Sequence, residues 1–138
     1  MKPALAVLLL LASTVAAEAA QFKVIVNRSV KSDSLTKQQV SDLFLKKTTK
    51  WTDGTAVAPV DQPDSSAARE AFSKEIHGKP ASAVKSYWTK QIFSGRDLPP
   101  MEKKTDAEVV AYVRATAGAV GYVSEGAETD GVRVVAVR

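Results

Sequence analysis

Residues 61–72 hold the side chains and backbone groups with the clearest chemical potential in this chain. A short apolar strand is predicted over residues 56–60, and apolar residues four apart predict a helix from near Ser66 to about His77. A strand that turns directly into a helix aims unpaired backbone N–H groups at one point, where the helix dipole is positive. The predicted chemistry is therefore anion binding. The candidate ligand-binding residues of this 64–69 loop are Asp64, Ser65, Ser66, Ala67, Ala68 and Arg69.

The same loop also fits an ordinary helix start. Ser66 can cap the helix by accepting a hydrogen bond from a backbone N–H group, and the guanidinium of Arg69 can be solvated. N-caps are far commoner than oxyanion sites, which favours this alternative on the local residues alone. In the other direction, the helix dipole disfavours a cation in the first turn, and a bound anion would offset that cost for Arg69. The sequence leaves both alternatives open.

The residue types that catalysis and metal binding need are sparse. The chain has one His, His77, and no Cys. On a helix that starts near Ser66, His77 would lie on the order of 16 Å from the loop serines, too far for a local Ser–His pair. The patterns G-x-S-x-G, G-x-G-x-x-G and Walker A do not occur in the sequence. We therefore expect neither an enzyme nor a metal or cofactor site.

Residues 1–20 have the pattern of a signal peptide. A basic residue precedes an apolar run of eight (residues 4–11), and Ala17-Glu18-Ala19 fits the small-x-small cleavage rule. Cleavage is expected between Ala17 and Ala20, and no cysteine follows the run that could carry a lipid anchor to a membrane. Residues 21–138 suffice for one domain with one core. An exported domain without disulfides fits a bacterial periplasm best.

The charge balance narrows the expected partners. The formal net charge is +4 and the isoelectric point is about 9.4. A basic balance favours nucleic acid in many proteins, but export argues against such a partner. Small anions or an acidic protein surface fit an exported basic domain better.

The rest of the chain supplies the elements that must position the 64–69 loop. The apolar run FKVIV at residues 22–26 predicts a strand covered on both faces, as in a parallel sheet. Capping boxes at Thr36 and Thr105 start two of the predicted helices. The predicted helices cover residues 37–47, 66–77, 80–94 and 105–117, the predicted strands cover 22–26, 56–60, 120–123 and 132–137, and residues 30–34 and 96–104 are expected to be loops. This order predicts an α/β fold with a mixed sheet and helices on both faces.

Three polar residues follow the first predicted strand, namely Asn27, Arg28 and Ser29. Open α/β sheets place ligands at the carboxyl ends of their strands. We therefore expect these residues as a possible second wall of the anion site.

Several segments resemble the phosphate-binding proteins of bacterial ABC transporters, which have the type II periplasmic-binding-protein fold. Residues 43–54 (LFLKKTTKWTDG) are similar to that family's FxGKxxxWxDG turn, and Pro59-Val60 precedes the position of its anion loop. Tyr87-Trp88 and residues 118–123 (GAVGYV) resemble its YW and PGAIGY segments. The resemblance covers roughly residues 22–137 and implies a single lobe of that fold, a short member of the family.

The family's ligand loop resembles R-x-D-G-S-G-T followed by Phe, and this chain carries part of it. Asp64 and Ser66 match the aspartate and serine, and Arg69 matches an arginine that many members have just after the threonine. By this resemblance, Asp64 would accept a hydrogen bond from protonated phosphate and repel sulfate. The departures are Gln62 for the arginine, Ser65 and Ala67 for the two glycines, and Ala68 for the threonine.

Two functions from different classes follow from the resemblance. The first is a periplasmic protein that binds phosphate or a similar oxyanion, weakly, because a single lobe leaves the anion open to water. Its expected partners are an ABC permease and a second wall from another protein lobe or a second copy in a homodimer. The alternative is a repurposed lobe that binds no small anion and acts as a periplasmic interaction or sensory module.

Overall fold

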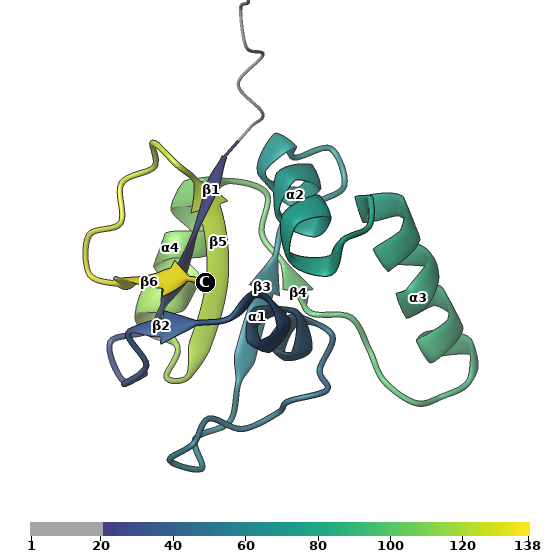
Figure 1. Ribbon diagram of the computed structural model, residues 1–138, viewed down its shortest axis with the longest axis horizontal. Helices are drawn as coiled ribbons and strands as arrows, with labels where there is room; N and C mark the ends of the chain where they lie inside the picture. The colour runs from purple at the N-terminus through teal and green to yellow at the C-terminus, as the bar shows by residue number, and fades with distance from the viewer. Residues whose placement is uncertain (1–20) are drawn as a thin grey trace, which may run out of the picture.

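Strand β1 (Phe22–Val26) lies inside a six-stranded sheet whose order is β2-β6-β1-β5-β3-β4 (Figure 1). This computed structural model describes residues 21–138, so the predicted signal peptide and its cleavage site lie outside the described residues. The other strands are β2 (Ser34–Leu35), β3 (Ala58–Asp61), β4 (Met101–Glu102), β5 (Ala119–Ser124) and β6 (Arg133–Val137).

The pairing of these strands confirms a mixed sheet. β1 pairs antiparallel with both β5 and β6, whereas β3 pairs parallel with β5 and β4, and β2 pairs parallel with β6. The expectation that β1 belongs to a parallel arrangement was therefore wrong. Its unbroken apolar run has another cause, which is that Val24 and Val26 pack on one face of the sheet and Ile25 packs on the other.

Helices cover both faces of the sheet, as the sequence predicts. They are α1 (Lys37–Phe44), α2 (Ala67–Phe72), the π-helical turn η1 (Ser73–His77), α3 (Ala81–Phe93) and α4 (Asp106–Ala115). The core on one face gathers apolar residues of α1, α2 and η1 against β1 and β5, and the core on the other face holds the valines of α4. α3 lies at the edge of the molecule (Figure 1) and turns Val84 and Trp88 inward.

Several boundaries differ from the sequence-based expectation for local reasons. α1 starts with the predicted capping box at Thr36 but ends earlier than expected, because Lys46 adopts a left-handed conformation with φ 56°. The helix expected over residues 66–77 is α2 followed by η1, and Gly78 ends it in the predicted left-handed conformation. β2 and β4 fall in or beside segments expected to be loops. Each has only two residues, too few for a periodic pattern.

An aromatic cluster on the α1–α2 side holds the end of α2. The rings of Phe72 and Tyr122 stack with centroids 4.0 Å apart, and Phe44 meets Phe72 edge-on at 4.7 Å. Both Phe72 and Tyr122 are almost fully buried. The cluster fixes α2 on β5, with the Tyr122 hydroxyl directed to the end of β3, where it meets the carboxylate of Asp61.

Gly118 joins two segments that the resemblance singled out. Its φ is 75°, its carbonyl accepts hydrogen bonds from the Trp51 indole at 2.8 Å and from the Ala58 N–H at 3.2 Å, and its own N–H donates to the Ser29 hydroxyl. A Cβ at this position would lie 2.1 Å from the carbonyl oxygen of Ala56. Only glycine fits both the conformation and the space.

We expect Gly118→Ala to destabilise the domain by roughly 2–4 kcal/mol, because the new methyl group meets backbone and the φ angle is strained. Chemical denaturation followed by circular dichroism would measure the free energy of unfolding. Gly126→Ala is the matched control, since nothing lies within 4 Å of its added Cβ. Equal stability of the two variants would show that Gly118 is not required.

Candidate functional site

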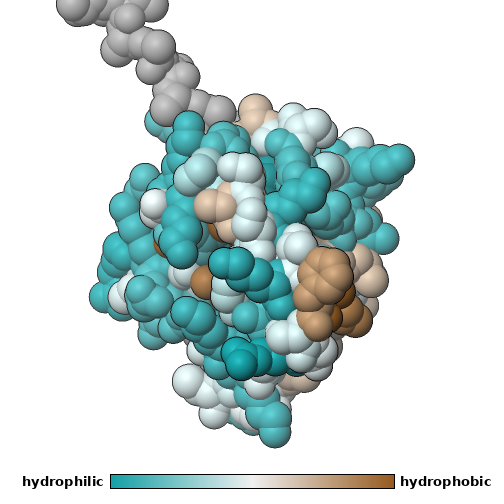
Figure 2. Space-filling model, turned by 90° about the vertical axis from the view of Figure 1, so that its right-hand side faces the viewer, coloured by the Kyte–Doolittle hydropathy of each residue, from teal (hydrophilic) through white to brown (hydrophobic). Residues whose placement is uncertain are grey.

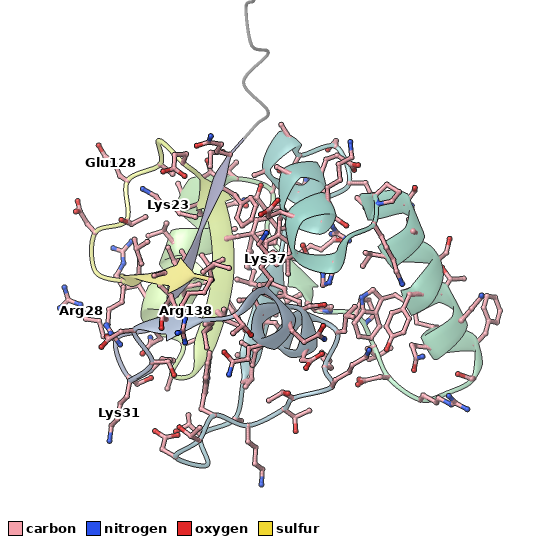
Figure 3. The ribbon with its side chains drawn as sticks, viewed as in Figure 1. Lys23, Arg28, Lys31, Lys37, Glu128 and Arg138 are labelled. Carbon is pink, nitrogen blue, oxygen red and sulfur yellow. The ribbon has the colours of Figure 1, made fainter. Side chains whose placement is uncertain are left out.

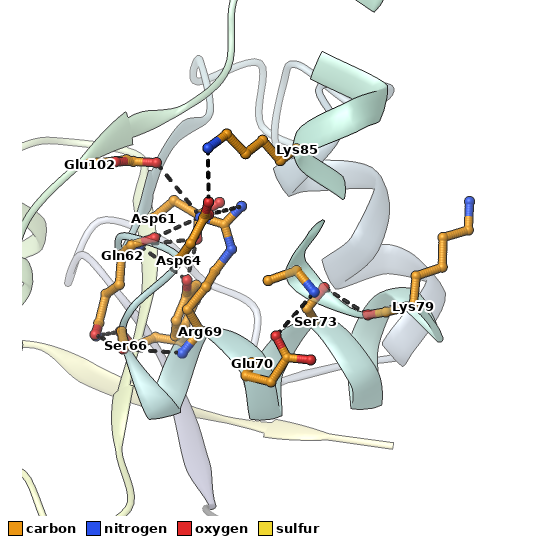
Figure 4. Close-up of polar contacts among 12 residues, drawn as sticks. Asp61, Gln62, Asp64, Ser66, Arg69, Glu70, Ser73, Lys79, Lys85 and Glu102 are labelled. Carbon is orange, nitrogen blue, oxygen red and sulfur yellow. Dashed lines mark hydrogen bonds and ion pairs between the residues drawn. The ribbon is translucent and has the colours of Figure 1, made fainter. Parts of the chain in front are cut away.

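The 64–69 loop begins α2 with an ordinary helix cap. The hydroxyl oxygen of Ser66 accepts a hydrogen bond from the N–H of Arg69 at 3.2 Å, and the same hydroxyl donates to the Gln62 side-chain oxygen at 2.6 Å (Figure 4). A turn precedes the cap, in which the Ser66 N–H donates to the Pro63 carbonyl. The structure thus contains the cap that the alternative predicted at Ser66, whose hydroxyl both donates and accepts a hydrogen bond within the chain.

Arg69 lies beneath the loop rather than in solvent, and its side chain is only 5% exposed. Its Nη1 donates to the Gln62 carbonyl at 2.6 Å and lies 3.1 Å from Oδ1 of Asp61. Two further carboxylates stand around the same guanidinium, Glu102 at 3.7 Å and Asp64 at 4.0 Å (Figure 4). The charge of Arg69 is thus balanced by groups of the chain itself.

Asp61 is the buried anionic partner of this arginine. The Tyr122 hydroxyl and the Gln62 N–H both donate to its Oδ1. Burial raises the pKa of Asp61, while the Arg69 guanidinium and these two donors oppose that rise. Burial and the nearby Asp61 carboxylate raise the pKa of Tyr122 far above its usual value, so its hydroxyl stays protonated and remains a donor.

Gln62 extends this network to the neighbouring strand and helix. Its side-chain amide donates to the Tyr122 carbonyl at 3.0 Å and to the Asp106 carboxylate at 3.0 Å. The residue is 3% exposed. Where the ligand loop of the resembling family has an arginine, this chain therefore has the neutral Gln62, whose hydrogen bonds connect β3, β5 and the start of α4.

A hollow of about 530 Å³ opens between the 64–69 loop, α3 and the segment before β4. It includes three of the predicted site residues, Asp64, Ser65 and Arg69. Lys85 of α3 enters it as well, with its Nζ 3.3 Å from Oδ2 of Asp64. The charged groups of the hollow are the cations Arg69 and Lys85 and the carboxylates Asp61, Asp64 and Glu102. Formally, two positive charges face three negative ones.

The remaining predicted residues of the loop point elsewhere. Ala68 is 4% exposed and packs in the core against the sheet. Ala67 lines a different hollow of about 950 Å³, between α2 and the strands β1 and β6. Of the six predicted residues, Asp64, Ser65 and Arg69 line one hollow, whereas the side chains of Ala67 and Ala68 lie outside it.

The structure separates Asn27, Arg28 and Ser29 from the 64–69 loop. β1 runs antiparallel to β5, and β5 runs parallel to β3. β1 and β3 therefore run in opposite directions, and their carboxyl ends lie at opposite ends of the strands of the sheet. Arg28 accordingly lies at the far side of the molecule from α3 (Figure 3). The Asn27 side chain bonds the Val113 and Arg114 carbonyls, which fastens the end of α4. These residues form no second wall for the loop within one chain.

His77 makes a contact that sequence spacing did not indicate. Its Nδ1 lies 2.8 Å from the hydroxyl oxygen of Ser41, on the neighbouring helix α1. Burial, helped by nearby Arg69, lowers the pKa of His77 to about 4. Neither His77 nor Ser41 lines either of the two hollows, and Ser41 is 6% exposed, so the pair ties η1 to α1.

The site network includes Asp61, Gln62, Lys85, Glu102 and Tyr122, none of which the sequence singled out as a site residue. Asp61 could have been found from the sequence, because it is a carboxylate at the end of a predicted buried strand. Lys85 and Glu102 could not, because they come from segments that are distant in the sequence. Among residues 21–138, no group of three or more His, Asp or Glu is placed to hold a metal ion. None of the helices described is both long and apolar enough to cross a bilayer.

Comparison with known proteins assigns the chain to a family. The model of a PBP superfamily domain matches residues 17–136. No curated protein matches the sequence. Among solved structures, the chain is similar to an ABC-type phosphate transport receptor from Vibrio cholerae, with 18% identity and a TM-score of 0.65. It is also similar to PstS from Borrelia burgdorferi, with 14% identity and a TM-score of 0.62.

A third similar structure is a Clostridium perfringens protein assigned as a phosphate ABC transporter substrate-binding protein and solved with bound phosphate. It shares 22% identity with this chain at a TM-score of 0.67. The matches cover 86% of this chain but only 46% of the Vibrio protein, 47% of the Borrelia protein and 45% of the Clostridium protein. This chain thus spans less than half the length of the proteins it matches, and the likeness to them shows the fold alone. The family match over residues 17–136 shows that the chain belongs to the PBP superfamily, that of the periplasmic binding proteins.

Proposed function

We propose that this chain is a single periplasmic-binding-protein-like lobe that acts as a periplasmic interaction or sensory module, without catalysis and without tight capture of a free anion. The observation that carries the proposal is the position of Arg69. Its guanidinium is 5% exposed and is already met by Asp61, Glu102, Asp64 and the Gln62 carbonyl. The cation that would receive an oxyanion is occupied by the chain.

The electrostatics of the hollow support the same conclusion. An entering phosphate would meet three carboxylates and only two cations. It would have to displace Asp64 or Glu102 from Arg69, and like charges at such distances repel strongly in a partly dehydrated site. Of the backbone donors at the start of α2, the N–H of Arg69 is already capped by Ser66, so it does not offset this cost.

Weak oxyanion binding is the second candidate. Ser65, Lys85 and Arg69 line one hollow, so a hydroxyl and two cations are available there. The similar proteins are named for phosphate, and one of them was solved with phosphate bound. In this case Asp64 would accept a hydrogen bond from protonated phosphate, and the partner would be an ABC permease or a second lobe.

Anion titration separates the two candidates. We expect no increase in melting temperature of the domain with phosphate or sulfate at tens of millimolar, beyond that given by sodium chloride at equal ionic strength. A true ligand at a hundred times its dissociation constant would stabilise the domain by about 2.7 kcal/mol. A phosphate-specific increase would establish the second candidate instead.

Removal of two carboxylates tests whether their negative charge is what keeps an anion out of the hollow. In Asp64→Asn with Glu102→Gln, two cations face only Asp61, so the formal balance of the hollow changes from −1 to +1. We expect this variant to gain phosphate and sulfate binding that calorimetry detects. The control variant Glu128→Gln with Asp130→Asn makes the same charge change on the β5–β6 loop, where Figure 3 labels Glu128 away from the hollow. Binding by neither variant would mean that the carboxylates do not close the site.

A further inference from the structure

A patch of exposed apolar side chains lies at the end of α3 and in the segment that leads to β4. Phe93 is 88% exposed, Leu98 66%, Met101 51% and Ile92 49%. Of the large hydrophobic side chains that are exposed among residues 21–138, only Val134 lies outside this tip patch. Figure 2 shows apolar residues gathered on the side of the molecule that carries α3. Isolated exposed apolar residues are ordinary, but four within residues 92–101 gather exposed apolar surface in one part of the chain.

The geometry of α3 turns Phe93 outward, whereas Ile92 lies beside the hollow that Trp88 also lines. Val84 and Trp88 form the buried face of the helix. At about 100° per residue, Phe93 falls on the opposite face, three residues after Lys90 and on the same side as that lysine. In the following segment, Pro99 and Pro100 restrict the backbone that carries Leu98 and Met101. α3 and this segment form the outer edge of the molecule (Figure 1).

The charges around the tip patch are predominantly positive. Lys90 and Arg96 are exposed, and within residues 21–138 neither makes an ion pair. The nearby carboxylates have cationic partners of their own, since Asp97 lies 3.8 Å from Lys46 and Glu102 lies 3.7 Å from Arg69. An apolar surface with uncompensated cations beside it is complementary to an anionic, partly apolar surface.

We propose that the tip patch docks on an anionic lipid surface, with Phe93 and Leu98 entering the interfacial region and Lys90 and Arg96 at the level of the headgroups. Charge complementarity favours this occupant over a second copy, because two copies meeting at this patch would bring like charges together. This inference does not rest on the function of the 64–69 loop, and it describes peripheral docking rather than a membrane span.

Vesicle sedimentation tests the proposal with the intact domain. The probes are vesicles of phosphatidylglycerol and phosphatidylcholine in equal parts, and vesicles of phosphatidylcholine alone. We expect binding to the anionic vesicles and little to the neutral ones. Lys90→Glu with Arg96→Glu should reduce the partition coefficient roughly thirtyfold or more, given the usual contribution of each cation at such a surface. Phe93→Ser with Leu98→Ser should reduce it at least about tenfold.

Matched controls separate the patch from general charge and hydrophobicity. Arg28→Glu with Lys31→Glu makes the same charge change at the other side of the molecule (Figure 3), and Val134→Ser removes an exposed apolar side chain elsewhere. Both controls should bind nearly as wild type, and melting curves should show that every variant is folded. Absence of binding to anionic vesicles would overturn the proposal in favour of an acidic protein partner. Equal losses in the patch and control variants would overturn it too.

Discussion

The ion pair between Arg69 and Asp61 is the interaction on which the candidate site depends. It joins the end of β3 to the first turn of α2, and both side chains are almost completely buried. Burying two charges is costly unless each is fully hydrogen-bonded. Tyr122 and Gln62 meet this condition, since both donate to Asp61 while the Gln62 carbonyl accepts from Arg69. The strand-to-helix turn, the aromatic cluster and the hollow thus belong to one connected arrangement.

The burial of Arg69 is consistent with a fold that contains one lobe. The chain covers less than half of the Vibrio, Borrelia and Clostridium proteins, and one lobe cannot by itself enclose an anion and exclude water. A cation left open on such a surface would be solvated and weakly selective. Here carboxylates of the same chain surround Arg69, so its charge is met within the domain. The exposed apolar side chains at the end of α3 border the same hollow, since Ile92 lines it together with Asp64 and Ser65.

Much of the fold was predictable because its signals are local. The apolar run of β1, the cap at Thr36 and the left-handed Gly78 each depend on residues within one turn or strand. β2 and β4 were missed because two-residue strands are defined by their neighbours rather than by their own pattern. The site was predicted less completely. Ser66 and Arg69 were correctly placed at the helix start, but Glu102 and Lys85 reach Arg69 and Asp64 only through tertiary packing, and the separation of Asn27 depends on strand direction.

A double-mutant cycle between Asp61 and Arg69 measures the buried pair most directly. The variants are Asp61→Asn, Arg69→Met and their combination, compared with wild type by the free energy of unfolding in denaturant. Arg69→Met leaves the Asp61 carboxylate buried without its cation, and Asp61→Asn leaves the guanidinium with only the more distant Glu102 and Asp64. The double variant should therefore be less destabilised than the sum of the two. A coupling free energy of at least about 2 kcal/mol is expected. Additivity within about 0.5 kcal/mol would contradict the account, because the two residues would then contribute to stability independently.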